Sequence, residues 1–252
     1  MTPEPAETEP ALHGVLVVTG TGTDVGKTVV TAAVAALAHA RGAAVAVVKP
    51  AQTGVCPGSD VPDVETIQRL SGVTDTHELS RFPDPLSPEA AARVSGLPPL
   101  DLAGAAGRIA RLADSRDLVL VEGAGGLLVR YDPAGATLAD LAALCGAPVL
   151  VVVAAGLGTL NHTALTLEAL AARRLALAGV AIGSWPREPG LAERENVADL
   201  ETLIGGPLAG ALPDGSGALG RDEFRAVARR HLGSVLGGTR GAGEAADDRA
   251  RS

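Results

Sequence analysis

The sequence predicts an α/β fold in which a mainly parallel sheet is covered by helices on both faces. Short apolar runs alternate with segments of helical period along the 252 residues, an order typical of strands joined by right-handed helical crossovers. Hydrophobic residues make up 46% of the chain but aromatic residues only 2%, so Val, Leu, Ile and Ala must fill the core. Such a core suits parallel strands that are buried on both faces.

The first half of the chain opens with a strand, a loop and a helix. A buried strand over residues 15–18 leads into a glycine-rich loop and a helix over residues 27–40. Gly42 can end this helix because glycine accepts a left-handed backbone, and Asp101 favours the start of a later helix because aspartate is a good N-cap. Apolar runs and helical period give the other elements in order: strand 44–48, helix 64–70, loop 83–88, helix 100–115 and strand 118–121.

The second half repeats this alternation of strands and helices. Residues 148–153 form an apolar run of the kind expected for a strand buried on both faces, and residues 159–177 form a long segment of helical period. The remaining elements are helix 138–144, strand 180–182, helix 191–203, strand 208–212 and helix 222–236.

Residues 20–28, Gly-Thr-Gly-Thr-Asp-Val-Gly-Lys-Thr, lie between the first strand and the first helix. Glycines allow a tight turn with inward N–H groups, and the helix start adds partial positive charge toward an anion. Lys27 is expected to reach the outer phosphates of a nucleotide and Thr28 to bind Mg²⁺. Five residues separate Gly20 from Gly26, where the common phosphate loop has four. The nucleotide-binding residues predicted here are Thr23, Asp24, Val25, Gly26, Lys27, Thr28 and Val29.

The loop and the alternation together predict a three-layer P-loop NTPase-like fold. We expect a flexible leader over residues 1–12, a single domain over residues 13–236 and a disordered tail over residues 237–252, because both ends lack an apolar period. The net charge of −8 argues against a nucleic-acid surface. The start of the chain lacks the pattern of a secretion signal, and no apolar run reaches the about 20 residues of a membrane helix. We therefore expect a cytoplasmic protein that binds neither nucleic acid nor membrane.

Glu122 follows the predicted strand 118–121 directly, at the carboxyl end where a parallel sheet binds ligands. Its carboxylate is an oxygen ligand of the kind that Mg²⁺ prefers, although a solvated glutamate at a strand end remains an alternative. The glycine-rich residues 123–126 can bring backbone N–H groups close to an anion.

Lys49 emerges in the same way from strand 44–48, so that two lysines are expected to converge on one crevice. Beside a triphosphate, Lys49 can neutralise the charge that develops during phosphoryl transfer. Thr53 is close enough in sequence to offer a hydroxyl to the same substrate. Asp63 fits two interpretations equally, a further metal ligand or a helix-capping aspartate.

Four motifs in this order resemble the dethiobiotin synthetase family: residues 20–28, 49–54, 121–129 and 158–162. The resemblance covers about residues 15–212. It implies an ATP-dependent cyclo-ligase that forms C–N bonds, a homodimer that converts 7,8-diaminopelargonic acid and CO₂ to dethiobiotin in biotin biosynthesis. Mg²⁺ is the implied cofactor, and the implied intermediates are a carbamate and a carbamic-phosphoric anhydride.

Matched residue by residue, the resemblance implies three sets of roles. The implied catalytic residues are Lys49, Lys27 and Thr23. The implied metal ligands are Thr28, Asp63 and Glu122. The implied substrate-binding residues are Lys49, Thr53, Glu122, Gly123, Ala124, Gly125, Gly126, Gly158, Thr159 and Asn161. In the family, the helix start that contains the last three of these reaches the substrate carboxylate bound by the partner subunit; from the residues alone, Thr159 or Asn161 can also be a plain helix cap.

The base-binding region departs from the family pattern. Many relatives have an asparagine after the strand that matches residues 180–182, whereas this chain has Gly-Ser-Trp-Pro at 183–186. Trp185 can either stack on a base or cover the core. We therefore expect relaxed nucleotide choice, with ATP or another nucleoside triphosphate as the co-substrate. The residues predicted to bind the base or ribose are Ser184, Trp185, Pro213, Asp214 and Gly215.

Three other functions compete with this interpretation. An amidoligase of the cobyrinate diamide synthase type carries a large glutaminase domain, for which this chain has no room. A partition or septum-site ATPase, which acts as a nucleotide switch, carries a lysine near the start of the phosphate loop, and residues 19–24 contain none. A non-catalytic binding module is disfavoured because Lys27, Thr28, Lys49 and Glu122 occur together. The switch ATPase is the alternative that we retain.

Overall fold

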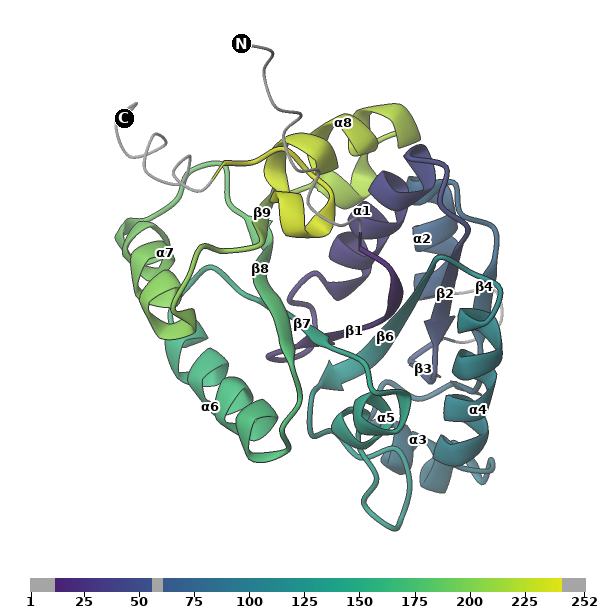
Figure 1. Cartoon of the computed structure of the whole chain (residues 1–252). Helices are drawn as coiled ribbons and strands as arrows, with labels where there is room; N and C mark the ends of the chain where they lie inside the picture. Colours follow the sequence, from purple (N-terminus) through teal and green to yellow (C-terminus); the bar gives the residue numbers. More distant parts are fainter. Residues whose placement is uncertain (1–11, 56–60, 242–252) are drawn as a thin grey trace.

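The protein is described by a computed structural model that covers residues 12–55 and 61–241. Its centre is a parallel sheet in the order β4-β2-β6-β1-β7-β8-β9, drawn in Figure 1. The strands are β1 (Gly14–Gly20), β2 (Val45–Lys49), β4 (Thr76–Glu78), β6 (Leu118–Gly126), β7 (Val149–Val153), β8 (Leu177–Trp185) and β9 (Gly210–Pro213). Strand β1 pairs with β6 on one side and β7 on the other, so the first strand of the chain lies in the middle of the sheet.

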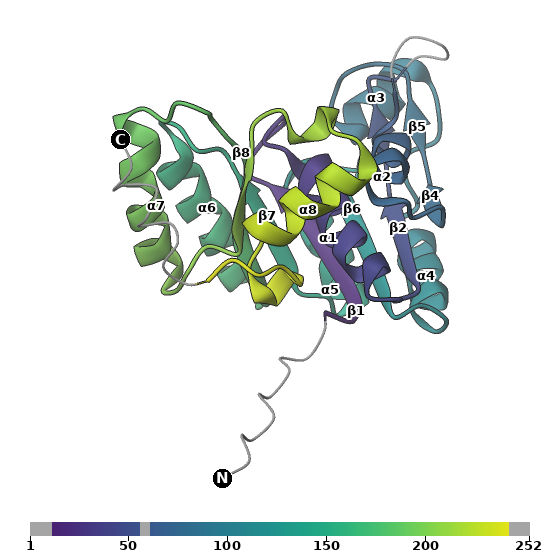
Figure 2. The same ribbon diagram turned by 90° about the horizontal axis from the view of Figure 1, so that it is seen from above.

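Helices cover both faces of the sheet and form two hydrophobic cores. One face carries α1 (Lys27–Ala40), α2 (Asp63–Ser71) and α8 (Arg221–His231), of which α1 and α8 lie side by side in Figures 1 and 2. The other face carries α3 (Pro88–Ser95), α4 (Leu102–Ala113), α5 (Leu138–Cys145), α6 (Thr159–Ala172) and α7 (Leu191–Ile204). Successive residues of β1 alternate between the two cores, since Leu16 and Val18 face one and Val17 the other. The predicted three-layer α/β fold is confirmed.

Several boundaries differ from the sequence prediction. The helix predicted over 159–177 ends at Ala172, because Arg174 adopts a left-handed φ of 55° and the chain then enters β8. The last helix, predicted to reach residue 236, ends at His231 and is followed by a 3₁₀ turn, Ser234–Leu236. The helix predicted over 100–115 is α4, and Asp101 caps it as expected, with its Oδ1 accepting the Gly104 N–H at 3.0 Å.

Some short elements were absent from the sequence prediction. Strands β3 (Gln52–Thr53) and β5 (Arg81–Phe82) form a separate two-stranded parallel sheet, and β4 extends the main sheet by three residues. Helix α3 begins at Pro88, where the sequence predicted the end of a loop. Strands this short contain too few residues to display a period, so only tertiary pairing reveals them.

Most of the predicted leader and tail, residues 1–11 and 242–252, lie outside the described residues. The first part of the predicted tail, residues 237–241, is held against the domain: the Thr239 N–H donates to the Arg229 carbonyl at 2.7 Å and the Arg240 N–H to the Leu232 carbonyl at 3.0 Å. Among the described helices, none combines the length and apolar character that a bilayer crossing requires.

Candidate nucleotide and substrate site

The glycine-rich loop connects β1 to α1 at the carboxyl edge of the sheet. A Cβ atom on Gly20 would lie 2.7 Å from Val25 Cγ2 and 2.8 Å from the Gly22 carbonyl oxygen, so the turn excludes any larger residue there. Gly26 has a φ of 94°, and a Cβ on it would meet the Gly183 carbonyl at 2.7 Å. The loop is therefore folded tightly against the end of β8, next to the region predicted to bind the base.

Lys27, the first residue of α1, reaches back over this loop. Its Nζ donates to the Gly22 carbonyl at 2.8 Å, and the residue is only 7% exposed. Burial, and next the nearby Lys49 ammonium, lower the pKa of Lys27 below its ordinary value of 10.5. The Lys27 ammonium is thus held inside the glycine loop, and no carboxylate of the described residues accepts a hydrogen bond from it.

A charged network joins β2, β6, α1 and α2 beside the loop. Lys49 Nζ lies 2.8 Å from Glu122 Oε1, 2.6 Å from Asp63 Oδ2 and 3.1 Å from the Gly123 carbonyl oxygen. Thr28 Oγ1 donates to the same Glu122 Oε1 at 3.0 Å. Because β2, β6 and β1 are neighbours in the sheet, the strand ends bring these residues together as predicted. Asp63 does not cap α2, whose N-cap residue is Pro62.

Burial and opposite charges act against each other in this network. Burial would lower the pKa of Lys49, but the carboxylates of Glu122 and Asp63 outweigh it and raise the pKa above the ordinary value. Burial would likewise raise the pKa of Asp63, but the Lys49 ammonium lowers it below the ordinary value. Lys49 therefore carries a permanent positive charge at neutral pH.

The acidic side chains of this network fit a divalent cation that also binds a nucleotide. Glu122 is 0% exposed, and its Oε2 atom is buried with no hydrogen-bond partner in the described structure. Such an atom keeps lone pairs available, and buried polar atoms rarely remain unpaired. Among the described residues, no three or more His, Cys, Asp or Glu side chains are grouped so that they could hold a metal ion by themselves. Mg²⁺ fits such a sparse site, since it usually takes one or two carboxylates together with phosphates and water.

A cavity of about 880 Å³ opens over the loop and the network. The predicted residues that line it are Thr23, Asp24, Gly26, Lys27, Thr28, Val29, Lys49, Thr53, Asp63, Ala124 and Gly125. The lining residues that the sequence did not predict are Gln52, Gly54, Pro85, Leu86, Ser87, Pro88 and Val129. Gln52, Gly54 and Val129 lie within the motifs 49–54 and 121–129, whose pattern could have marked them. Residues 85–88 lead into α3, which the sequence did not reveal.

Tyr131 is a further residue that sequence reasoning missed. The Ala124 N–H donates to its hydroxyl oxygen at 2.9 Å, and Tyr131 is 0% exposed. Burial raises the pKa of Tyr131, so the phenol is neutral at physiological pH. The contact anchors the glycine-rich end of β6 from behind the cavity.

The residues predicted to bind the base form a second group at the end of β8. Ser184 Oγ donates to Asp214 Oδ1 at 2.9 Å, and the Asp214 N–H donates to the Trp185 carbonyl at 2.7 Å. The half-buried Trp185 packs against the hydrophobic core, as one of the two interpretations expected. Pro213 and Gly215 flank Asp214 in the same loop.

The start of α6 lies apart from the main cavity. Gly158 is the N-cap residue, with a φ of 90°, and no side chain caps the helix, so neither Thr159 nor Asn161 has the capping role that the sequence allowed. Asn161 is exposed, and the preceding Leu157 is 90% exposed. Behind this loop, Asn196 Nδ2 donates to the Ala155 carbonyl at 2.8 Å. At the helix start Gly158 and Asn161 are exposed, whereas Thr159 is buried and its N–H donates to the Gly156 carbonyl at 3.3 Å.

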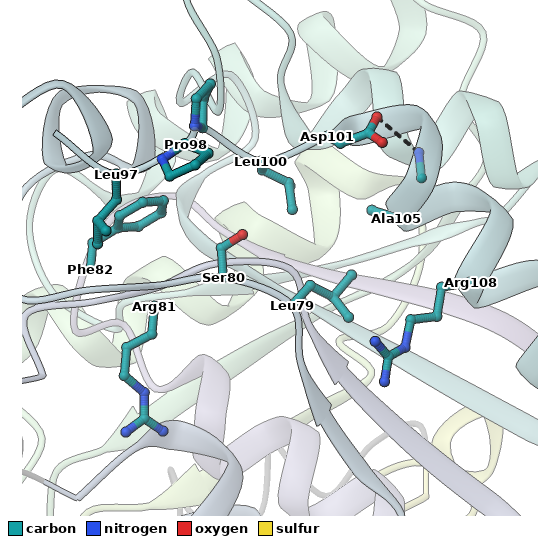
Figure 3. Close-up of a pocket in the computed structure, with 12 residues that line it drawn as sticks. Leu79, Ser80, Arg81, Phe82, Leu97, Pro98, Leu100, Asp101, Ala105 and Arg108 are labelled. Carbon is teal, nitrogen blue, oxygen red and sulfur yellow. Dashed lines mark hydrogen bonds between the residues drawn. The ribbon is translucent and has the colours of Figure 1, made fainter.

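A second cavity of about 490 Å³ lies between β5 and the start of α4 (Figure 3). Phe82 and Leu100 contribute apolar surface to it, and Arg81 and Arg108 contribute guanidinium groups. Arg81 is already paired with Glu78. None of the predicted site residues lines this cavity, so the predicted chemistry belongs to the larger one.

A parallel sheet with a glycine loop, a buried lysine and a carboxylate network at its carboxyl edge defines a P-loop nucleotide-binding protein. The AAA domain family matches residues 14–217. Two solved structures share the fold: the cell division ATPase MinD of Pyrococcus furiosus, at 20% identity and a TM-score of 0.51 over 94% of this chain and 100% of that one, and a ParA family ATPase from Chlorobium tepidum, at 14% identity and a TM-score of 0.54 over 90% and 98%.

Sequence relatives narrow the class further. The chain is 68% identical over 224 residues to the ATP-dependent dethiobiotin synthetase BioD of Frankia casuarinae, covering 89% of this chain and 94% of the relative. It is 57% identical over 225 residues to the protein of the same name from Streptomyces avermitilis, again covering 89% and 94%. The chain belongs to the ATP-dependent dethiobiotin synthetase family, an enzyme family of ligases, which confirms the resemblance found in the sequence.

Proposed function

We propose that this chain is a Mg²⁺-dependent dethiobiotin synthetase of biotin biosynthesis. The observation that carries the proposal is that Lys27, Thr28, Lys49 and Asp63 line one cavity, while the buried Glu122 contacts both Thr28 and Lys49. Family membership supplies the substrates, 7,8-diaminopelargonic acid, CO₂ and ATP or another nucleoside triphosphate. The cavity supplies cations, carboxylates and backbone amides, which suit phosphoryl transfer and need no nucleophile from the protein.

The proposed reaction has three steps. One amine of the substrate attacks CO₂ and loses a proton, which gives a carbamate. A carbamate oxygen then attacks the γ-phosphorus of the nucleotide, and the nucleoside diphosphate leaves with the electrons of the broken P–O bond. The second amine attacks the carbonyl carbon of the mixed anhydride, inorganic phosphate leaves, and loss of a proton completes the ring. Lys49 and Thr53 would hold the carbamate, and Lys27 and Thr23 with the loop amides would hold the phosphates.

Thr28, Asp63 and Glu122 would hold Mg²⁺, which neutralises phosphate charge when it is bound. Gly123, Ala124, Gly125 and Gly126 would lie against the substrate. The Ala124 N–H donates to the Tyr131 hydroxyl, so it would hold this segment in place and not bind the substrate itself. Neutralising the phosphate charge in a site shielded from water is expected to stabilise the transition state more than the same charges would in bulk solvent.

We further propose that the enzyme is a cytoplasmic homodimer whose substrate site is shared across the interface. The uncapped start of α6, with Gly158, Thr159 and Asn161, would bind the carboxylate of the substrate held by the partner subunit, because a helix N-terminus attracts anions. The exposed Leu157 beside it supports an apolar contact with another subunit.

The shared site can be tested by mixing two inactive variants, Lys49→Met and Asn161→Leu. A mixed dimer would contain one fully wild-type site, and random exchange would make about half of all dimers mixed, so about a quarter of the wild-type activity should return. The Lys49→Met and Lys27→Ala pair is the matched control, since both changes lie in the same cavity of one subunit. Equal activity for the two mixtures would contradict the shared site.

The proposed reaction can be tested with labelled bicarbonate, 7,8-diaminopelargonic acid and ATP, CTP or GTP, with detection of a labelled ureido product. We expect label in the product only when diamine, Mg²⁺ and nucleotide are all present, and much less label with the Lys49→Met protein. Nucleotide hydrolysis without label transfer would favour the partition or septum-type ATPase switch instead. The comparisons do not favour that switch, since the MinD and ParA likenesses concern the fold alone.

A further inference from the structure

Helix α2 carries the Asp63 carboxylate in its first turn but has no side-chain cap of its own. Its N-cap residue is Pro62, which has no polar side chain to offer the first helical N–H groups. The Asp63 N–H instead donates to Gln52 Oε1 at 3.0 Å. A side chain eleven residues earlier in the chain thus supplies an acceptor for the first N–H group of the helix, whereas a serine or aspartate N-cap would accept from the second or third.

Gln52 is itself firmly held. It is 5% exposed, and its Nε2 donates to the Thr53 carbonyl at 3.2 Å, so both ends of the amide are engaged. Its backbone N–H donates to the Ser80 carbonyl at 2.9 Å, and its Cα pairs with Arg81 in the β3–β5 sheet. The acceptor oxygen therefore occupies a fixed position at the wall of the main cavity.

We propose that Gln52 is a positioning residue that holds the start of α2, and with it the Asp63 carboxylate, in the geometry needed for metal binding. The inference rests on the proposed function, in which Asp63 is a Mg²⁺ ligand. Asp63 Oδ2 lies 2.6 Å from Lys49 Nζ, and a shift of the first turn would move this carboxylate away from the Glu122 side of the network. Partners that orient a metal ligand typically change metal affinity by about 10–100-fold when removed.

A glutamine at position 52 suits this role better than the similar residues asparagine and glutamate would. Asparagine is one methylene shorter and would leave the Asp63 N–H without its acceptor. Glutamate would keep the acceptor oxygen but lose the donor to the Thr53 carbonyl. The Gln52→Glu variant therefore separates helix capping, which it retains, from the link to Thr53, which it loses.

The test uses Gln52→Ala, Gln52→Glu and a matched control, Gln68→Ala. Gln68 lies on the same helix, and its Nε2 donates to Thr76 Oγ1 at 2.6 Å, so its removal disturbs α2 away from the first turn. Mn²⁺ binding in the presence of a non-hydrolysable ATP analogue is measured by electron paramagnetic resonance. Exchange of the Asp63 amide hydrogen is followed by NMR.

We expect Gln52→Ala to weaken Mn²⁺ binding about tenfold and to speed exchange at Asp63, whereas Gln68→Ala should change neither. Gln52→Glu keeps an acceptor oxygen for the Asp63 N–H, so exchange of the Asp63 amide hydrogen should stay slow in this variant. Unchanged Mn²⁺ affinity in Gln52→Ala, or an equal loss in Gln68→Ala, would overturn the inference. Asp63→Asn is measured alongside: if this variant binds Mn²⁺ as tightly as wild type, the metal assignment of the proposed function fails first. If Asp63→Asn weakens binding but Gln52→Ala does not, only the positioning role fails.

Discussion

Replacing Lys49 with methionine should destabilise the metal-free protein strongly. Lys49 Nζ lies 2.6 Å from Asp63 Oδ2 and 2.8 Å from Glu122 Oε1, and the Lys49 and Glu122 side chains are 4% and 0% exposed. Methionine has a similar length, so the change removes the charge rather than the packing. Loss of one partner from a buried ion pair costs about 3–5 kcal/mol, because the remaining charge is left uncompensated. For a protein of this size that cost corresponds to a melting temperature lower by about 10 °C.

The assay is thermal unfolding, followed by circular dichroism in EDTA, of the wild type, Lys49→Met, Glu122→Gln and the double variant. The double variant should recover much of the stability that Lys49→Met loses, because the most deeply buried uncompensated carboxylate is then absent. Turnover should fall by about a hundredfold or more in Lys49→Met, while nucleotide binding stays close to wild type. A melting temperature for Lys49→Met equal to that of the wild type would refute this account of the network.

Three other expectations concern the rest of the site. The pKa of Asp63 is below its ordinary 3.8, so its contribution to stability is present above about pH 4 and is lost as the pH falls through the lower folded-state pKa. The melting temperature should therefore change less with pH across this acid range in Asp63→Asn than in the wild type. Gly183→Ala would place a Cβ in collision with the Val25 carbonyl oxygen and should weaken nucleotide binding in a titration, whereas Gly206→Ala, with open space around it, should not. Because Trp185 packs on the core, kcat/KM for ATP, CTP and GTP should agree within about tenfold, and strict dependence on ATP would contradict this.

The sequence predicted the centre of the fold well because strong local signals fix it. The helix over 27–40 has its start set by the loop motif and its end by Gly42, and the structure places α1 over the same residues. Parallel strands then bring Lys49 and Glu122 to the same edge, since neighbouring strands end side by side. The site follows from strand order as much as from any single motif.

The residues that the sequence did not reveal depend on contacts between distant segments. Gln52 and Tyr131 are ordinary residues in the sequence, and they gain a role only when folding sets them against Asp63 and Ala124. For Asp63 the sequence left two interpretations open, and local pattern alone does not separate a capping aspartate from a ligand. The structure removes the capping interpretation because the N-cap residue of α2 is Pro62 and the Asp63 carboxylate pairs with Lys49.

The two lysines of the cavity differ in what balances their charge, and this difference assigns them different tasks. Carboxylates compensate Lys49 and raise its pKa, whereas burial and the Lys49 ammonium lower the pKa of Lys27. Within the described ranges, the Nζ of Lys27 donates a hydrogen bond to the neutral Gly22 carbonyl and to no carboxylate. An incoming polyphosphate gains most beside the cation that lacks an anionic partner. Nucleotide affinity should therefore depend on Lys27 far more than on Lys49, and Lys49 can be removed without losing the nucleotide, although the network around it then loses its balance of charge.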